Sequence, residues 1–343
     1  MKALQKIEPA FGLHFRDVPQ PTSPAAGEVI VAVGATGVCG TDIHIYEWTG
    51  GYESMTRALP VTLGHEFAGT VAAVGTGVAL KEGARVAVRP SVVCGQCPRC
   101  RGGDSDNCLN HRGIGVTRDG ALASHVRVPV ENCVVVPDTL PMELAALTEP
   151  MTVCAEAVDN AALKAGDRVL ILGPGNIGQG CALFARAAGA QVVLVGRNDA
   201  PRLGALRRMG FDALVDTGDQ PLAQALGDHL ADGPFDAVIE ATGAPAVVQP
   251  GLDVLKKRGI FVAVGIQPKE VAIDITKLIR AHQQIRGSYR SPIPTWRRVV
   301  DFLAVNTTLA MEMISHRLPL ERAIEGLELS RTKTASKVVV VPD

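Results

Sequence analysis

The chain has 343 residues, of which 47% are hydrophobic and 20% charged, and its formal net charge is −1. This length predicts about two domains with a substantial core, and the composition excludes a disordered or collagen-like chain. The near-neutral charge, the 4% aromatic content and the lack of a long apolar stretch argue against nucleic-acid and membrane partners. Lys6, Glu8 and Pro9 precede any apolar run, so we expect no signal peptide and a cytoplasmic protein.

The part of the chain before Pro150 carries short β-branched runs that glycine and proline separate. The runs are residues 29–33, 69–74, 85–88 and 133–136. Short strands at this spacing are typical of a barrel or a sandwich. A last β run, at residues 336–342, is expected to return to this first domain.

After Pro150, helix-like and strand-like segments alternate. The expected helices are 151–162, 177–188 and 202–209, and the expected strands are 168–172, 191–195, 237–240 and 260–264. Apolar strands that alternate with helices indicate a parallel sheet covered on both faces. The sequence therefore predicts an α/β chain with a doubly wound domain in its middle.

Four of the eight cysteines lie within fifteen residues, with the spacing Cys94-x2-Cys97-x2-Cys100-x7-Cys108. Because nothing marks the chain for export, metal-bound thiolates are a better interpretation than disulfides. Four thiolates in a short loop suit a tetrahedral Zn²⁺ with no open position, which indicates a structural role. An iron–sulfur cluster is one alternative, because four cysteines also hold those clusters. A zinc-ribbon DNA reader is another, but Asp104 and Asp106 offset Arg99 and Arg101, so no basic patch is expected.

A second group of metal-binding residue types is dispersed along the chain. Cys39 lies in VCGTDIH, His65 and Glu66 lie in GHEFAG, and Glu149 lies in TEPMTV. Each is a weak signal by itself, but together they offer a thiolate, an imidazole and carboxylates, which suit a catalytic zinc with an open position. Asp42 could accept the other ring N–H of His65 and fix its tautomer.

A glycine-rich loop connects the strand 168–172 to the helix that follows it. The loop residues are Gly173, Pro174, Gly175, Asn176, Ile177 and Gly178. A strand before and a helix after this spacing are the required context for dinucleotide binding. Gly173 allows the tight turn, Gly175 lets the pyrophosphate approach, and Gly178 lets the helix pack closely. The helix N-terminus then offers N–H groups to the phosphates.

Taken in order, these three motifs resemble those of the zinc-dependent medium-chain alcohol dehydrogenases. The family signature G-H-E-x2-G-x5-G-x2-V begins at Gly64, and the cysteine loop has the family's 3-3-8 steps. CGTDIHIYEW is similar to L-threonine 3-dehydrogenases, and TEP is similar to sorbitol and other polyol dehydrogenases. The resemblance implies a β-rich GroES-like catalytic domain over 1–152 and 287–343, and a Rossmann domain over 153–286.

The resemblance also implies the roles of individual residues. The positions that match zinc ligands are Cys39, His65 and Glu149 for a catalytic ion, and Cys94, Cys97, Cys100 and Cys108 for a structural ion, giving two Zn²⁺ per chain. Glu66 matches a residue that binds the catalytic zinc directly or exchanges with water. Thr41 and His44 match a hydroxyl–imidazole relay that carries a proton to solvent. A homo-oligomer, in the form of a tetramer, is also implied.

The sequence after the second expected strand bears on the choice of nicotinamide cofactor. NAD enzymes place an acidic residue about 20 residues past the glycines to bind the ribose, and this position falls on Gly196. Arg197 and Arg202 suit a 2′-phosphate, so the sequence favours NADP. Alternatively, Asp199 binds the ribose of NAD, or it caps the next helix. Further cofactor contacts are predicted at Asn198, Thr242, Gly265 and Ile266.

These features predict an oxidoreductase that transfers a hydride between a secondary alcohol, a polyol or vicinal diol, and NAD(P). L-threonine 3-dehydrogenase is one alternative; its substrate needs a carboxylate partner, and the available arginines are Arg89, Arg112, Arg118 and Arg290. An alternative of another class is a non-enzymatic zinc-binding protein that uses the cysteine loop for partners. A zinc-free quinone reductase would lack both ligand sets.

Overall fold

The computed structural model describes residues 1–342, which form two compact units. The first unit contains residues 1–149, 300–307 and the chain from Ile314 onward, and the second contains Pro150–Val299 and Thr308–Met313. The domain limits expected from the sequence stay a prediction; residues 287–299, expected with the first domain, lie in the second unit. None of the helices in residues 1–342 has the length and apolar character needed to cross a bilayer.

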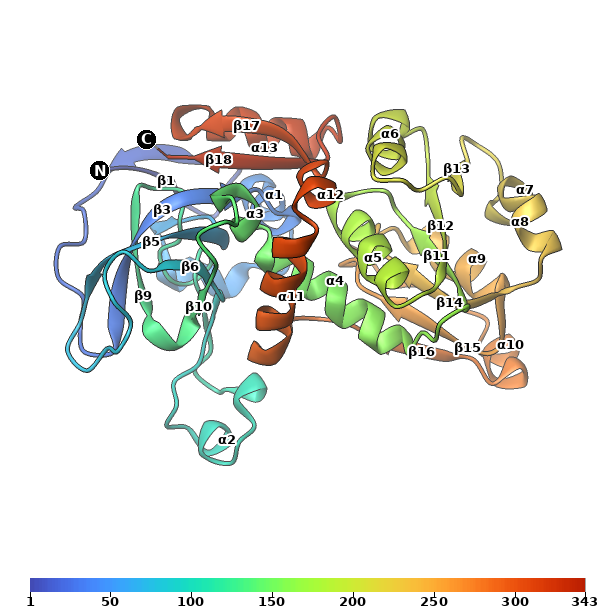
Figure 1. The fold of residues 1–343 in the computed structure, drawn as a ribbon, viewed down its shortest axis with the longest axis horizontal. Coiled ribbons are helices and arrows are strands. Elements are labelled where there is room, and N and C mark those ends of the chain that lie inside the picture. Colours follow the sequence, from blue (N-terminus) through green and yellow to red (C-terminus); the bar gives the residue numbers. More distant parts are fainter. Residues whose placement is uncertain (343) are drawn as a thin grey trace. The chain divides into compact units, whose positions relative to one another are not determined.

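The first unit is built on a seven-stranded sheet (Figure 1). Its order is β10 (Cys133–Val135), β6 (Arg85–Val88), β5 (Glu66–Val74), β3 (Glu28–Gly37), β18 (Lys337–Val341) and β17 (Ile314–Pro319), with β9 (His125–Pro129) also paired to β3. Two smaller sheets join β2 (His14–Asp17), β1 (Lys2–Lys6) and β4 (Val61–Thr62), and β7 (Ser91–Val92) with β8 (Arg112–Gly113). Valines alternate along β3, and Val29, Val31 and Val33 pack into one buried cluster with Phe67. The C-terminal run returns to this unit, because β18 pairs with β3.

Short helices complete the first unit. They are α1 (Gly40–Glu47), α2 (Pro98–Arg101), α3 (Met142–Ala146) and α13 (Ala323–Arg331), with 3₁₀ turns η1 (Glu53–Ala58), η2 (Ser105–Asn107), η3 (Val130–Asn132) and η5 (Leu320–Arg322). A second apolar cluster joins Ile45 of α1, Leu327 of α13 and Val338 of β18. The start of α1, which carries candidate site residues, is thereby held against the last strand.

The second unit is a six-stranded, wholly parallel sheet. Its order is β13 (Leu214–Asp216), β12 (Gln191–Gly196), β11 (Arg168–Leu172), β14 (Phe235–Glu240), β15 (Leu255–Ala263) and β16 (Gln284–Gly287). The helices of this unit are α5 (Asn176–Ala187), α6 (Ala200–Arg208), α7 (Leu222–Leu226), α8 (Asp228–Ala231), α9 (Val248–Asp253) and α10 (Ile275–Ala281), and η4 (Pro245–Val247) is a 3₁₀ turn. Three further helices lie where the chain passes from one unit to the other: α4 (Thr148–Ala161), α11 (Ile293–Val305) and α12 (Thr307–Met311).

The strand order of this sheet determines where a ligand binds. Numbered along the unit, the order is 3-2-1-4-5-6, which is the doubly wound Rossmann arrangement, so the predicted fold class is confirmed. The chain changes direction across the sheet between β11 and β14. In such sheets ligands bind beyond the carboxyl ends of the strands at this point, where the glycine-rich loop follows β11.

Candidate functional site

Three of the dispersed ligand residues come together in the first unit. Cys39 precedes α1, His65 directly precedes β5, and Glu66 is its first residue. One ligand atom from each lies within 4.8 Å of the other two, and His65 and Glu66 are buried. Glu149, in the first turn of α4, falls outside this group, but its charge interacts with those of His65 and Glu66. These four residues are called the dispersed set below.

Asp42 orients two members of the dispersed set. Its carboxylate is 1% exposed, and Oδ2 accepts the Cys39 N–H at 2.9 Å, which caps the start of α1. Its Oδ1 lies 3.5 Å from Nδ1 of His65. A carboxylate in this position orients the ring so that its other nitrogen faces away, as metal-binding histidines require.

Lys337 contacts the dispersed set, although the sequence did not single it out. Its ammonium contacts Glu66 Oε2 and donates to the Val38 carbonyl at 2.8 Å, and the Lys337 and Glu66 side chains are only 3% and 2% exposed. Gly37 makes room for this pair, because a Cβ there would lie 2.3 Å from Glu66 Oε2. Lys337 opens an apolar strand 271 positions after Glu66, so no local pattern connects the two.

The electrostatics of the dispersed set favour a bound cation. Burial, with the charge of Glu66, raises the pKa of Cys39, and burial raises the pKa of Glu149 to about 7. Burial lowers the pKa of His65, but Asp42 and Cys39 outweigh it and raise that pKa well above its usual value. The raised pKa values of Cys39 and Glu149 mean that both groups lose their protons more readily when a cation is bound, and a thiolate, an imidazole and a carboxylate suit Zn²⁺.

The two residues of the predicted proton relay, Thr41 and His44, both lie next to Tyr52, which the sequence did not single out. His44 Nδ1 lies 3.1 Å from the Thr49 hydroxyl, and its ring stacks with Tyr52 at a centroid distance of 6.4 Å. The Tyr52 hydroxyl is hydrogen-bonded to Thr41, and burial raises its pKa. Thr41 and His44 are thus both next to the same phenol.

The four clustered cysteines form a compact sulfur site in a lobe around α2 and η2. The Sγ atom of Cys94 lies 4.0 Å from that of Cys100 and 3.6 Å from that of Cys108. A tetrahedron of Zn–S bonds has edges of about 3.8 Å, so the spacing fits one tetrahedral ion. N–H groups from the backbone, above all that of Gln96, lower the pKa of Cys94 to about 6. None of the eight cysteines, all of which lie within residues 1–342, forms a disulfide, so all four clustered thiols are available to a metal ion.

The glycine-rich loop of the second unit leaves a helix end open to a ligand. Gly173 has a φ of 108°, and a Cβ on Gly178 would lie 1.8 Å from the Gly173 carbonyl, so both positions require glycine. No side chain caps α5, which begins after Gly175. Its first N–H groups are therefore available to a phosphate. This geometry fits a dinucleotide.

The residues after β12 hold a guanidinium beside this loop. Asp199 occupies the N-cap position of α6, but its buried carboxylate binds Arg202 rather than capping the helix. The Arg202 Nη1 atom lies 3.3 Å from the position of a Cβ on Gly175. Arg197 is 73% exposed and pairs with Asp219, while Gly196 is buried at the end of β12. Asn198 has a φ of 51°, and Asp216 accepts its N–H.

The remaining predicted cofactor residues follow β14 and β15 at the same end of the sheet. A Cβ on Gly173 would lie 2.8 Å from Cγ2 of Thr242, so the two turns are in close contact. A Cβ on Gly265 would lie 2.2 Å from the Gly243 nitrogen, and Ile266 is 65% exposed. The structure therefore brings the turns after β11, β14 and β15 together.

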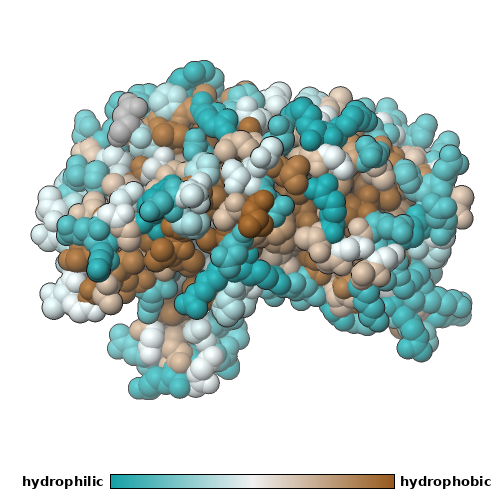
Figure 2. Space-filling view, viewed as in Figure 1, coloured by the Kyte–Doolittle hydropathy of each residue, from teal (hydrophilic) through white to brown (hydrophobic). Residues whose placement is uncertain are grey.

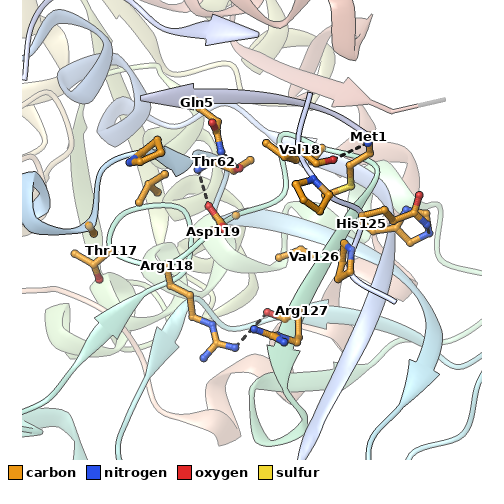
Figure 3. A pocket seen from close by; sticks show the side chains of 18 of the residues that line it. Met1, Gln5, Val18, Thr62, Thr117, Arg118, Asp119, His125, Val126 and Arg127 are labelled. Atoms are coloured by element: carbon orange, nitrogen blue, oxygen red, sulfur yellow. Dashed lines mark hydrogen bonds between the residues drawn. The ribbon is translucent and has the colours of Figure 1, made fainter. Parts of the chain in front are cut away.

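Two of the four candidate carboxylate-binding arginines line a separate cavity of about 840 Å³ in the first unit (Figure 3). Arg118 pairs with Glu28 there, and Arg112 donates to the Thr117 carbonyl at 2.8 Å. Figure 3 also shows Asp119 accepting the Thr62 N–H, at 2.9 Å. No residue of the dispersed set lines this cavity. Of the other two, Arg89 pairs with Asp106, and Arg290 packs over Tyr289.

Comparisons with known proteins agree with these two units. Residues 25–138 match the model of the alcohol dehydrogenase GroES-like domain, and residues 176–305 match that of the zinc-binding dehydrogenases. An L-threonine 3-dehydrogenase of Sinorhizobium fredii is 34% identical over 99% of this chain and 98% of its own length.

Solved structures of dehydrogenases also align with this chain over nearly its whole length. A zinc-binding dehydrogenase of Sinorhizobium meliloti bound to NADP is 34% identical, with a TM-score of 0.88 over 99% of both chains. The 2R,3R-butanediol dehydrogenase of Bacillus subtilis is 26% identical, with a TM-score of 0.86 over 100% of this chain and 99% of that one. With both family models matched in order and relatives aligned over nearly their whole length, the chain belongs to the zinc-dependent medium-chain alcohol dehydrogenases.

Proposed function

We propose that this dehydrogenase oxidises a secondary alcohol, a polyol or vicinal diol, and reduces NAD(P), with a catalytic zinc at the dispersed set and a structural zinc at the four clustered cysteines. The observation that carries the proposal is the group of Cys39 and the buried His65 and Glu66, whose ligand atoms lie within 4.8 Å of one another. When bound, zinc would lower the pKa of the substrate hydroxyl, and the nicotinamide would accept the hydride.

The chain's own residues then have distinct roles. Cys39, His65 and Glu149 hold the ion, and Glu66 binds it or is kept back by Lys337. The substrate proton passes to the Thr41 hydroxyl and leaves by way of His44, because an imidazole can accept a proton at one ring nitrogen and release one from the other. Tyr52 lies beside both residues and supports this path. His44→Asn is expected to lower the rate and shift its pH profile, and an unchanged rate and profile would remove His44 from the relay.

A panel of alcohols tests the substrate class. Polyols, vicinal diols such as 2,3-butanediol, and L-threonine are assayed with the zinc-loaded enzyme and both cofactors. L-threonine is the second candidate, because the S. fredii relative, 34% identical, is an L-threonine 3-dehydrogenase. Strong preference for a primary aliphatic alcohol would refute both. Two zinc ions per chain with measurable turnover would exclude the non-enzymatic zinc-binding alternative.

The preferred cofactor is proposed to be NADP. Gly196 offers no carboxylate to repel a 2′-phosphate, and the carboxylate of Asp199 is already bound to Arg202. The NADP-bound S. meliloti relative also supports this preference. The measurement is kcat/KM for NADP and NAD on the wild type and on Arg197→Ala. If NAD is preferred at least about tenfold and Arg197→Ala leaves NADP use unchanged, the proposal fails and Asp199 becomes the ribose ligand.

We further propose that the protein is a cytoplasmic homo-oligomer, a tetramer. In the second unit, β16 is the edge strand of the sheet, and Ile285 on it is 41% exposed. Ile275 and Ile279 on the neighbouring α10 are 56% and 63% exposed. An open strand edge with exposed isoleucines favours pairing with a second copy. A monomer in sedimentation at micromolar concentration would contradict this.

A further inference from the structure

A buried carboxylate connects the two turns that follow β14 and β15. Glu240, the last residue of β14, is fully buried. Its Oε1 atom accepts the N–H groups of Thr242 at 2.6 Å and of Gly243 at 2.9 Å, and also the Thr242 hydroxyl. Its Oε2 atom accepts the Gln267 side-chain amide at 2.9 Å. One side chain thus bonds to both turns.

The backbone of Glu240 strengthens the same connection. Its carbonyl accepts the N–H groups of Val264 and Gly265, at 3.0 and 3.1 Å. Packing there is close, because a Cβ on Gly265 would lie 2.8 Å from Glu240 Oε2. A shorter or apolar side chain at position 240 would leave the N–H groups of Thr242 and Gly243 without this acceptor and would release the Gln267 amide, while the backbone bonds to Val264 and Gly265 would remain.

This carboxylate has no ion-pair partner. Within residues 1–342 no lysine, arginine or histidine pairs with Glu240, so its charge is balanced by N–H and O–H donors only. Burying a carboxyl without a cation costs free energy, and hydrogen bonds from well-placed donors offset this cost. The same hydrogen bonds hold the donors, and therefore the two turns, in fixed positions. Asp236, at the other end of β14, accepts the Arg168 N–H and pairs with Lys256, as a structural acid does.

We propose that Glu240 is a positioning residue for the nicotinamide cofactor: it fixes the Thr242–Gly243 turn against the Gly265–Gln267 segment so that both line the cofactor site. The inference rests on the proposed function, in which Thr242, Gly265 and Ile266 contact the cofactor. Glu240 itself is fully buried and acts through these turns. The role requires an acceptor at Oε1 and a bond to Gln267, and does not require a negative charge.

That requirement separates two substitutions. Glu240→Ala removes the acceptor and the bridge. Glu240→Gln keeps an oxygen for Thr242 and Gly243, and its new amide can donate to Gln267 Oε1, a buried atom that has no partner within residues 1–342. Asp236→Ala is the matched control, because it removes a carboxylate from the same strand away from the two turns.

The experiment measures the Kd of NADPH and of NADH by cofactor fluorescence on the full-length, zinc-loaded protein, together with the Tm of each variant. We expect Glu240→Ala to raise the cofactor Kd by about tenfold or more, Glu240→Gln to stay within about threefold of the wild type, and Asp236→Ala to lower Tm without changing Kd. If Glu240→Ala lowers Tm as Asp236→Ala does and leaves Kd unchanged, the residue is only structural and the inference fails.

A second variant keeps the test decisive if Glu240→Ala does not fold. Gln267→Ala breaks the bridge to Oε2, together with a 3.5 Å bond from the same amide to the Gly265 carbonyl, and leaves Oε1 with its donors. It is expected to raise the Kd severalfold, and an unchanged Kd would overturn the inference. The proposed function fails separately: a wild type that binds neither NADPH nor NADH refutes it and the inference together. A wild type that binds a cofactor while Glu240→Ala or Gln267→Ala binds it equally well refutes the inference only.

Discussion

Lys337 supplies a buried positive charge to a cluster of acidic groups. Glu66 and Lys337 are both at most 3% exposed, so water cannot stabilise either charge if the other is removed. Lys337→Met is expected to destabilise the protein by about 3–5 kcal/mol, because it leaves the Glu66 carboxylate buried without its cation. The measurement is the free energy of unfolding in urea.

A double substitution separates lost charge pairing from lost packing. Lys337→Met with Glu66→Gln removes both charges, and it should recover part of the loss that Lys337→Met causes. Equal destabilisation in the single and the double variant would show that Lys337 acts through packing or through the Val38 carbonyl.

Lys6, which is not part of the dispersed set, makes the stability of the protein depend on pH. Its fully buried ammonium donates to the carbonyls of Ala10, Gly12 and Tyr46, and burial lowers its pKa to about 8, with a partial offset from Glu8. Between pH 8 and 10.5 the unfolded chain binds more protons at this lysine than the folded one, so its contribution to stability rises with pH.

The prediction is tested by comparison with Lys6→Met. The stability of the wild type relative to this variant should increase as the pH is raised from 8 towards 10, measured by urea unfolding at each pH. The comparison cancels other titrating groups, which both proteins share. A difference that is flat with pH would show that the pKa of Lys6 is not shifted by folding, and one that falls would show that folding raises it; either result would refute the prediction.

Residues of the site were predictable from the sequence where a local motif carries them. The spacing of the four cysteines, GHE and the glycine loop all lie in short segments whose residue types suit one chemistry. Lys337 was not predictable, because its partner depends on β18 pairing with β3. The sequence did not predict Tyr52 and Glu240 for a related reason. A lone tyrosine or a glutamate at a strand end is common, and only the folded turns bring it next to its partners.

At the scale of elements, we expect the lobe of α2 and η2 to depend on the proposed structural zinc for its stability. On the face seen in Figure 2 this lobe is largely hydrophilic, and α2 has four residues, none of them buried, so little apolar packing holds it together. Cys97→Ser is expected to lose one zinc per chain and to lower Tm by roughly 5 °C or more, because structural zinc contributes folding free energy. Zinc content and thermal unfolding measure this.

Cys133→Ser is the control for that substitution, because Cys133 lies on β10 and belongs neither to the four clustered cysteines nor to the dispersed set. It should keep both zinc ions. If Cys97→Ser melts like the wild type but has no turnover, the catalytic and structural roles of the two sites have been exchanged.

Most of the expected elements are present with bounds that differ by one to three residues, and the larger differences have local causes. β11 and β6 have the predicted limits, because each is a short apolar run with clear breaks. β15 begins at Leu255, five residues before the expected strand, although Lys256, Lys257 and Arg258 follow. These charged residues are exposed, and the strand accommodates them through a register shift against β14. A hydrophobic pattern does not predict such a shift.

At the scale of the whole molecule, the two proposed zinc sites separate chemistry from stability. Cys39→Ala is expected to keep the fold and the structural zinc while kcat/KM falls by at least about 100-fold, because the catalytic ion loses its thiolate. Circular dichroism, zinc content and turnover test this together. A variant that keeps both ions and wild-type turnover would remove Cys39 from the site.

The pairing of β18 with β3 also sets the order in which the protein can become active during synthesis. Cys39, His65, Glu66 and Glu149 all leave the ribosome well before Lys337, which arrives on the last strand. Until then the nascent chain holds Glu66 beside Gly37 without its cation. The sheet of the second unit, residues 168–287, is by that time fully synthesised. A translation product that stops before residue 337 would therefore carry every predicted zinc ligand and still lack a finished catalytic centre.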